Sequence, residues 1–265
     1  MRIITLMTDF GTKDGNVGVM KGVILGIAPE VRLVDLSHHI TPQSIPEAAL
    51  VLRRSLPYFP AGSIHLVVVD PGVGTSRRPM AAQLGAQFVV GPDNGLITLA
   101  LENAEAHSER LKFIHLDRPQ YWLPEVSHVF HGRDIFAPAA AHLAAGVALE
   151  ALGSPITDPV RIILPQAVRT ASGWRGEVIH IDHFGNISTN IRQEQLGFPY
   201  RMKLRLCGVE IDGLVRTFGE RVPGELVALY GSTGNLLACV VNGSAAQRLG
   251  ANIGDTCEVC LDKTS

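Results

Sequence analysis

Residues 63–78 read SIHLVVVDPGVGTSRR, an apolar run that leads into an irregular, charged loop. β-branched residues dominate the run, and it ends on Asp70, so we expect a buried strand with an acid at its carboxyl end. The P-G-V-G that follows breaks regular structure and lets the backbone approach a ligand closely. Arg77 and Arg78 close the loop. The stretch therefore predicts a central strand of a sheet followed by a ligand-binding loop.

Runs of the same kind alternate with helical stretches along the first half of the chain. We expect strands at 3–9, 31–37, 63–70, 87–93 and 112–117, and helices at 17–29, 44–59, 95–104 and 135–146. Such alternation favours a mostly parallel sheet with helices on its faces. Residues 1–152 are therefore predicted to form an α/β domain.

The character of the sequence changes near residue 153. Residues 153–172 contain three prolines and little periodicity, which is typical of a linker. From 173 to 265 the chain offers short strands separated by glycines and no convincing long helix. We expect a smaller all-β domain there, built as a barrel or a sandwich.

Composition narrows the class of protein. The chain has 265 residues, 46% of them hydrophobic and 18% charged, and a net charge of −2 with its lysines and arginines spread out. This pattern predicts neither nucleic-acid binding nor a membrane span, and the short first apolar run does not resemble a signal peptide. A cytoplasmic protein is expected. The lone C-x-x-C at Cys257 and Cys260 has no second ligand pair, so we expect reduced thiols rather than a zinc site.

Four acids stand at or just past the ends of predicted strands. In open α/β sheets ligands bind outside the carboxyl ends of the strands, which directs attention to Asp9, Asp35, Asp70 and Asp93. A single such acid is commonly a helix cap or a turn residue. Four in one sheet favour a binding edge.

The loop after Asp70 fits neither common phosphate-binding motif. It lacks G-x-x-x-x-G-K-[ST], and it follows the third strand rather than the first. A carboxylate and a guanidinium acting together on a small ligand is the interpretation we favour. Of the ten histidines, His131 is the best candidate to join them, because it stands between an apolar pair and Gly132 just before an alanine-rich helix. Asp134 is expected to cap that helix.

Two further loops carry candidate binding residues. The first, 8–18, contains Asp9, Asp14 and Asn16 and would suit a diol or an ammonium group. The second, 181–190, reads IDHFGNISTN and places polar groups and Phe184 around a turn. Turn chemistry alone explains the F-G-N equally well.

Six motifs together resemble one family. TDFG, VVDPGVGTSRR, GPDNGL, FHGRDIFAP, HIDHFGNISTNI and YGSTGNL occur in this order along nearly the whole chain. They resemble the S-adenosyl-L-methionine hydroxide adenosyltransferases, which are related to the fluorinase and chlorinase. The resemblance implies an α/β domain followed by a β-barrel domain, no metal and no added cofactor. It also implies a homotrimer that binds its substrate between the N-terminal domain of one subunit and the C-terminal domain of its neighbour.

The resemblance also assigns roles to single residues. The catalytic residues fall on Asp70, Arg77 and His131. The substrate-binding residues fall on Asp9 for the ribose, Asp14 and less securely Asn16 for the methionine end, Asp182, Phe184 and Asn186 for the adenine and methionine portions, and Ser232. Asn242 maps loosely, because the spacing before it is shifted by about one residue.

The implied reaction is hydrolysis of S-adenosyl-L-methionine to adenosine and methionine by in-line attack of water on the ribose C5′. Arg77 stays protonated and would stabilise hydroxide character, while Asp70 or His131 would take the proton. The halogenating relatives have an uncharged residue where Asp70 stands, and a carboxylate would repel a halide.

Three alternatives stay open. One is a halogenase acting on the same substrate, and another is a nucleoside-binding or sensor protein with weak catalysis. The third is a metal hydrolase using Asp9, Asp14, His38, His39 and Asp70, which the absence of an H-x-H or H-E-x-x-H pattern disfavours.

Overall fold

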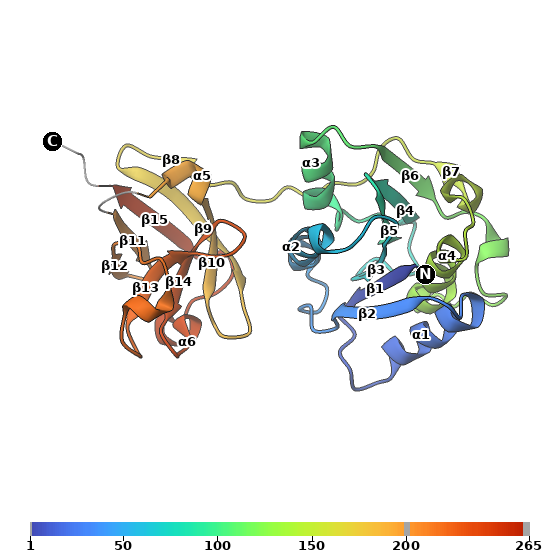
Figure 1. The fold of residues 1–265 in the computed structure, drawn as a ribbon, viewed down its shortest axis with the longest axis horizontal. Coiled ribbons are helices and arrows are strands. Elements are labelled where there is room, and N and C mark those ends of the chain that lie inside the picture. The colour runs from blue at the N-terminus through green and yellow to red at the C-terminus, as the bar shows by residue number, and fades with distance from the viewer. Residues whose placement is uncertain (1, 199–201, 262–265) are drawn as a thin grey trace. The chain divides into compact units, whose positions relative to one another are not determined.

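The computed structural model describes residues 2–198 and 202–261 of the chain. The chain divides into two compact units, residues 1–163 and 164–265, each with its own sheet and its own core (Figure 1). The expected linker, 153–172, is divided between them: β7 (Ser154–Pro155) pairs with a strand of the first unit, and β8 (Val168–Arg169) pairs with a strand of the second.

The sheet of the first unit is mixed. Its order is β2 (Arg32–Ser37), β1 (Ile3–Thr8), β3 (Ile64–Val68), β5 (Gln87–Pro92), β4 (Pro79–Leu84), β6 (Leu111–His115) and β7. The pairs from β2 to β5 are parallel, and those from β5 to β7 are antiparallel. The prediction of a mostly parallel sheet is therefore confirmed for one half and wrong for the other.

The physical reason for the difference is β4, a strand that the sequence did not predict. Its PMAAQL has no β-branched residue, so its strand tendency is weak. Between Leu84 and Gln87, which pair with one another, lies a two-residue turn in which Gly85 has φ +60°. A turn this short joins antiparallel strands only, because a parallel pair needs a crossover of about a dozen residues or more.

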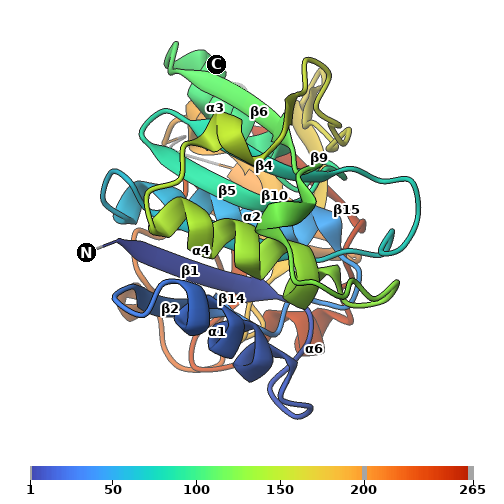
Figure 2. The same ribbon diagram turned by 90° about the vertical axis from the view of Figure 1, so that its right-hand side faces the viewer.

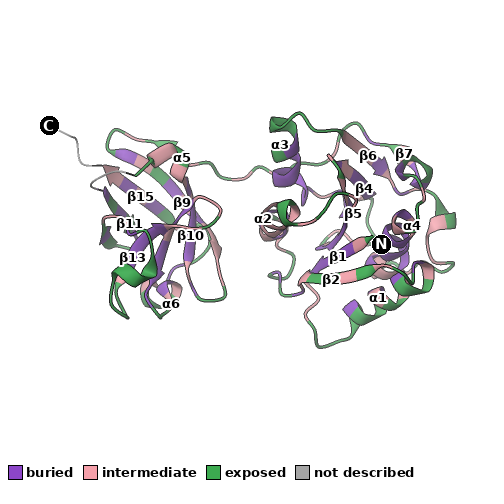
Figure 3. Cartoon of the chain, viewed as in Figure 1, coloured by how far each residue is buried: buried purple, intermediate pink, exposed green. Residues whose placement is uncertain are grey.

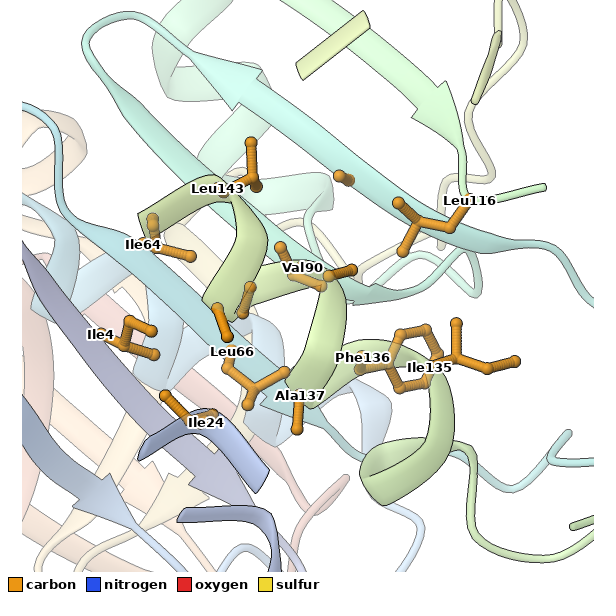
Figure 4. Close-up of a cluster of buried hydrophobic side chains, with 14 of the residues drawn as sticks. Ile4, Ile24, Ile64, Leu66, Val90, Leu116, Ile135, Phe136, Ala137 and Leu143 are labelled. Carbon is orange, nitrogen blue, oxygen red and sulfur yellow. The ribbon is translucent and has the colours of Figure 1, made fainter. Parts of the chain in front are cut away.

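Helices cover both faces of this sheet. α1 (Asn16–Ile27) and α4 (Ala137–Ala144) pack on one face, and Figure 2 shows α4 lying along β1. α2 (Ile45–Ser55) and α3 (Thr98–Ala106) pack on the other face. Alternate strand residues enter opposite cores, so Leu66 joins the α1 and α4 cluster (Figure 4) while Val67 joins the α2 and α3 cluster. The central strands and most of α4 are buried, whereas the outer face of α1 is exposed (Figure 3).

The order of the strands creates a binding edge. After β1 the chain crosses to β2 on one side, and after β2 it crosses back to β3 on the other side of β1. The carboxyl ends of β1 and β3, where Thr8 pairs with Val68, therefore flank a topological switch point. Ligands of open α/β sheets bind at such points. Asp9 and Asp70 each follow one of these two strand ends within two residues.

The second unit is a single antiparallel sheet. Its order is β12 (Val209–Asp212), β11 (Met202–Leu206), β15 (Thr256–Leu261), β9 (Gly173–Ile181), β10 (Ile187–Arg192), β14 (Asn235–Val240) and β13 (Leu226–Tyr230), with β8 on β9. The two ends of this order, β12 and β13, also contact each other, which makes the sheet barrel-like. The expected all-β domain is confirmed.

The remaining elements are short. The second unit holds two small helices, α5 (Gln193–Leu196) and α6 (Ala245–Leu249). Single 3-10 turns occur at Leu56–Tyr58, Pro119–Tyr121, Leu149–Leu152 and Phe218–Glu220. All four cysteines are free thiols, with Cys239 and Cys257 buried. Among the described residues, no helix has the length and apolar character needed to cross a membrane.

Candidate active site

An ion pair between Asp70 and Arg77 lies at the carboxyl end of β3. Arg77 Nε donates to both carboxylate oxygens, at 2.8 Å to Oδ1 and 3.0 Å to Oδ2, and Nη2 also donates to Oδ2. The side chain of Asp70 is 5% exposed and that of Arg77 is 9% exposed. Such forked pairs combine charge with fixed geometry, so the two groups hold each other in one orientation.

The loop between them is folded tightly. Two successive turns form it, with Val73 N donating to Asp70 O and Thr75 N to Gly72 O, and the Thr75 hydroxyl donates to Gly72 O at 2.7 Å. Gly74 has φ +76°, and a Cβ there would lie 2.3 Å from the carbonyl oxygen of His128. Glycine is therefore required at 74, and it brings the loop against the segment that leads to His131.

His131 completes a contiguous group of three. Arg77 Nη2 lies 2.9 Å from His131 Nδ1. His131 stands just before a π-helical segment, Gly132–Phe136, that continues into α4. Segments of this kind are rare and occur frequently at functional sites. The structure thus brings together the three residues expected to be catalytic.

The expected cap role of Asp134 is wrong. Asp134 lies inside the π-helical segment, where its backbone NH already donates to Phe130 O. Its buried carboxylate instead accepts from Ser127 N at 2.9 Å and Arg133 Nε at 2.6 Å. Asp134 therefore fastens the loop before His131 to the helical segment after it.

Electrostatics fix the state of His131. Burial, and next the positive charge of Arg77, lower the pKa of His131 below its ordinary value, so the imidazole is neutral at pH 7. A guanidinium can only donate, so Nδ1 accepts and the proton of the neutral ring is on Nε2. Within the described part of the chain, Arg77 Nη1 is buried without a hydrogen-bond partner. The guanidinium lies above the Phe136 ring, 5.1 Å from its centroid.

The first loop brings Asp9 and Phe10 to this edge. Asp9 Oδ2 accepts from Gln43 N at 2.8 Å. The ring of Phe10 packs edge-on against Phe130, with centroids 5.8 Å apart, which joins the end of β1 to the segment carrying His131. Farther along the loop, Asp14 and Asn16 are exposed at the start of α1.

Two of the four strand-end acids serve the fold instead. Asp35 pairs with Lys21 at 2.6 Å. Asp93 is buried, and its carboxylate accepts from Arg78 Nε and from Val160 N, both at 2.8 Å. Within residues 2–198 and 202–261, no group of three or more His, Cys, Asp and Glu side chains is arranged to hold a metal ion.

The second unit has a hollow of about 530 Å³ on its surface. Three of the expected substrate-binding residues line it, together with four that the sequence did not indicate: Phe184, Asn186 and Asn242, with Phe218, Val240, Gly243 and Ser244. Ser232 is exposed in the turn between β13 and β14 and does not line this hollow.

Asp182 builds the wall of the hollow rather than lining it. Its Oδ1 accepts from the backbone NH groups of Phe184 and Asn186, both at 2.9 Å, and its Oδ2 accepts from Asn186 Nδ2 at 2.8 Å. Gly185, with φ +80°, closes the turn against Ser244. The turn leaves Phe184 73% exposed. Phe218 is also 40% exposed, and an aromatic residue in the polar, turn-rich stretch RTFGE is the one feature that could have predicted it.

Comparison with known proteins covers both units. Residues 4–153 match the model of the SAM hydroxide adenosyltransferase N-terminal domain, and residues 176–258 match that of the C-terminal domain. A Salinispora tropica protein named (R)-S-adenosyl-L-methionine hydrolase is 40% identical over 261 residues, which is 97% of each chain. A fluorinase from Actinoplanes is 30% identical and covers 80% of this chain and 79% of its own.

A solved structure resembles this chain over nearly its whole length. The crystal structure of an uncharacterized conserved protein from Thermotoga maritima has a TM-score of 0.89 and 34% sequence identity, covering 97% of this chain and 99% of its own. The family models, matched in order over most of the chain, and the full-length relatives show that this chain belongs to the SAM hydroxide adenosyltransferase family.

Proposed function

We propose that this protein hydrolyses S-adenosyl-L-methionine to adenosine and methionine. The observation that carries the proposal is the contact of Asp70 and His131 with a single guanidinium, that of Arg77, at the switch point of the sheet. Hydroxide adenosyl transfer, the activity for which the family is named, is the chemistry this group supports. Asp70 favours water over a halide as the nucleophile, because its carboxylate repels an anion in a buried site.

Arg77 is proposed to stabilise the attacking water. Three of its donor interactions are with Asp70 and one is with His131, which fixes the orientation of the guanidinium. A water bound to the Asp70 carboxylate would gain hydroxide character beside this fixed positive charge, and such preorganised charge is a large source of catalysis. Attack in line with the C5′–S bond then sends the bonding electron pair to sulfur. Methionine leaves as a neutral thioether, so no acid is needed.

Asp70 is proposed to take the proton of the water. His131 Nδ1 is engaged by Arg77, and the neutral ring already carries a proton on Nε2, so His131 has no free lone pair. The carboxylate of Asp70 retains lone pairs beyond those that face Arg77. We assign His131 the task of orienting the guanidinium, and Asp70 that of general base.

The binding residues divide between the two units. We propose that Asp9 binds the ribose diol and that Asp14 and Asn16 bind the methionine end. The hollow containing Phe184, Asn186, Phe218 and Asn242 is proposed to take the adenine, with Asp182 holding the turn. Ser232 is assigned to the same domain's contacts with substrate.

The assembly is proposed to be a cytoplasmic homotrimer in which the C-terminal domain of a neighbouring subunit completes each site. The resemblance of the six motifs supports this assignment. Light scattering after gel filtration measures the mass, and a monomeric result would contradict it. We also propose that the reaction needs no metal or cofactor, since charge neutralisation at sulfur supplies the leaving group. Undiminished turnover after treatment with a chelator is the expected result.

Incubation with S-adenosyl-L-methionine in heavy-oxygen water tests the activity. We expect the label in the 5′ hydroxyl of adenosine, with methionine released in equal amount. Addition of chloride or bromide tests the halogenase alternative, which predicts a 5′-halo-adenosine. Tight adenosine binding without turnover would contradict hydrolysis and favour a sensor.

A further inference from the structure

The turn after β5 contacts both ends of the loop that carries Asp70 and Arg77. Asn94 Nδ2 donates to the carbonyl oxygen of Val69 at 2.9 Å. Asp93 N donates to the carbonyl oxygen of Arg78 at 2.9 Å, and the Asp93 carboxylate accepts from the Arg78 side chain.

Each of these contacts is made to the residue next to one member of the Asp70–Arg77 ion pair. Val69 precedes Asp70 directly, and Arg78 follows Arg77 directly. A shift of the Val69 carbonyl or of the Arg78 backbone therefore moves the carboxylate or the guanidinium. The chain between them has turns of its own, yet its position relative to the sheet depends on these two ends.

The chemistry of position 94 fits this task closely. The Asn94 amide donates to Val69 O and its Oδ1 accepts from Leu96 N at 3.2 Å, so both of its ends are used. An acid at 94 would keep the second bond and place a carboxylate oxygen against a carbonyl oxygen. Asp93 complements it as a buried carboxylate, which is costly unless paired, and here it is fully paired.

We propose that Asp93 and Asn94 are positioning residues for the hydrolysis reaction, which hold the Asp70–Arg77 pair in its reactive geometry through Val69 and Arg78. This inference rests on the proposed function. It removes Asp93 from the set of ligand-binding acids at the strand ends. It also gives the GPDN stretch, residues 91–94, a role in catalysis without contact with the substrate.

Two variants of Asn94 test the proposal. Asn94→Ala removes the bond to Val69 O, and Asn94→Asp removes it while keeping the size of the side chain. We expect kcat to fall about 10- to 100-fold with KM within about twofold, because a small misplacement of catalytic groups costs rate rather than affinity. The matched control is Gln87→Ala, at the other end of β5, whose amide also donates to backbone carbonyls, those of Leu56 and Phe59. It is expected to leave kcat unchanged.

An NMR titration of His131 gives a readout that a merely structural role would not move. Arg77 contributes to the low pKa of His131, so retreat of the guanidinium in the Asn94 variants should raise that pKa toward 6.5. The Gln87 variant should leave it unchanged. Folded Asn94 variants with unchanged kcat and unchanged His131 titration would overturn the proposal. Because the titration needs no turnover, it tests the positioning role even if the wild-type protein proves not to hydrolyse the substrate.

Discussion

The loop after Asp70 and the turn after Asp182 both place an acid before a glycine-containing turn, DPGVG in one and DHFGN in the other. The Asp182 carboxylate accepts three hydrogen bonds from its own turn, from Phe184 and Asn186. Among the residues that the structure describes, only Arg77, seven residues away, donates to the Asp70 carboxylate. Asp70, whose carboxylate is not hydrogen-bonded by its own turn, is therefore available for chemistry. Asp182 instead holds a turn that exposes the ring of Phe184.

Of the changes that test this difference between the two loops, replacement of Asp70 should have the largest effect on turnover. Asp70→Asn removes the proposed proton acceptor and the charge that holds Arg77, so we expect kcat to fall about 10³-fold, within the range typical of general-base removal. Adenosine release measured by chromatography gives kcat, and calorimetry checks that substrate still binds. Glu258→Gln serves as the control, since this 39% exposed acid also pairs with an arginine, Arg175, outside the site. Turnover of Asp70→Asn near that of the wild type would end the assignment.

Removal of the Phe184 ring should come next in size. Stacking of a base on an aromatic side chain is worth about 1–3 kcal/mol, so Phe184→Ala should raise KM by about tenfold or more while kcat changes little. Steady-state kinetics separate the two constants. Phe198→Ala is the matched control, because Phe198 is also an exposed aromatic of the second unit but packs on Tyr230 outside the hollow. Equal effects of the two variants would contradict the assignment of the hollow to adenine.

Asp182→Asn tests whether the Asp182 carboxylate serves only to hold its own turn. The variant keeps an oxygen for the two backbone NH groups and loses the bond from Asn186 Nδ2, so we expect a loss of about 1 kcal/mol in the free energy of unfolding. Urea denaturation measures it, and kcat should stay within about twofold. A loss of kcat as large as that of Asp70→Asn would erase the distinction between the two loops.

The smallest expected effect is a difference in pH dependence between kcat, which depends on the first unit, and binding to the second unit. Burial and Arg77 hold the pKa of His131 below 6.5, and protonation of Nδ1 would break its bond with Arg77. As the pH falls through that lowered pKa, kcat should decline, so its acidic limb lies below pH 6.5. The Kd of adenine, which we assign to uncharged contacts of the second unit, should stay flat over the same range. An acidic limb above pH 6.5 would contradict the neutral state of His131.

Much of the first unit could be predicted because its parallel strands are buried on both faces. Apart from His65, IHLVV of β3 is apolar throughout, and the acid that follows it marks the strand end. β4 escaped because the A-A pair in PMAAQL packs in the core without the β-branched residues that announce a strand. The direction of β4 followed from a two-residue turn at Gly85 that only the fold reveals.

The site was partly predictable for a related reason. Motifs placed Asp70 and Arg77 in one segment and His131 in another, but no pattern could state that Arg77 contacts both of the others. Asp93 shows the limit of the strand-end rule. Like Asp70, it follows a strand end. Only the three-dimensional structure shows that its carboxylate is hydrogen-bonded by Arg78 and Val160.

The route of the chain over the sheet has a consequence for variation. Residues 69–78 leave β3, pass the end of β5 and enter β4, so their two anchors are two strand spacings apart, about 10 Å. Both anchors are set when the sheet forms, and the conformational entropy of the loop is therefore lost during folding and not when substrate binds. Surface loops ordinarily accept inserted residues at a small free-energy cost. With an insertion here the protein would still fold, but the loop would have to be ordered when substrate reacts. The insertion would therefore lower turnover rather than stability.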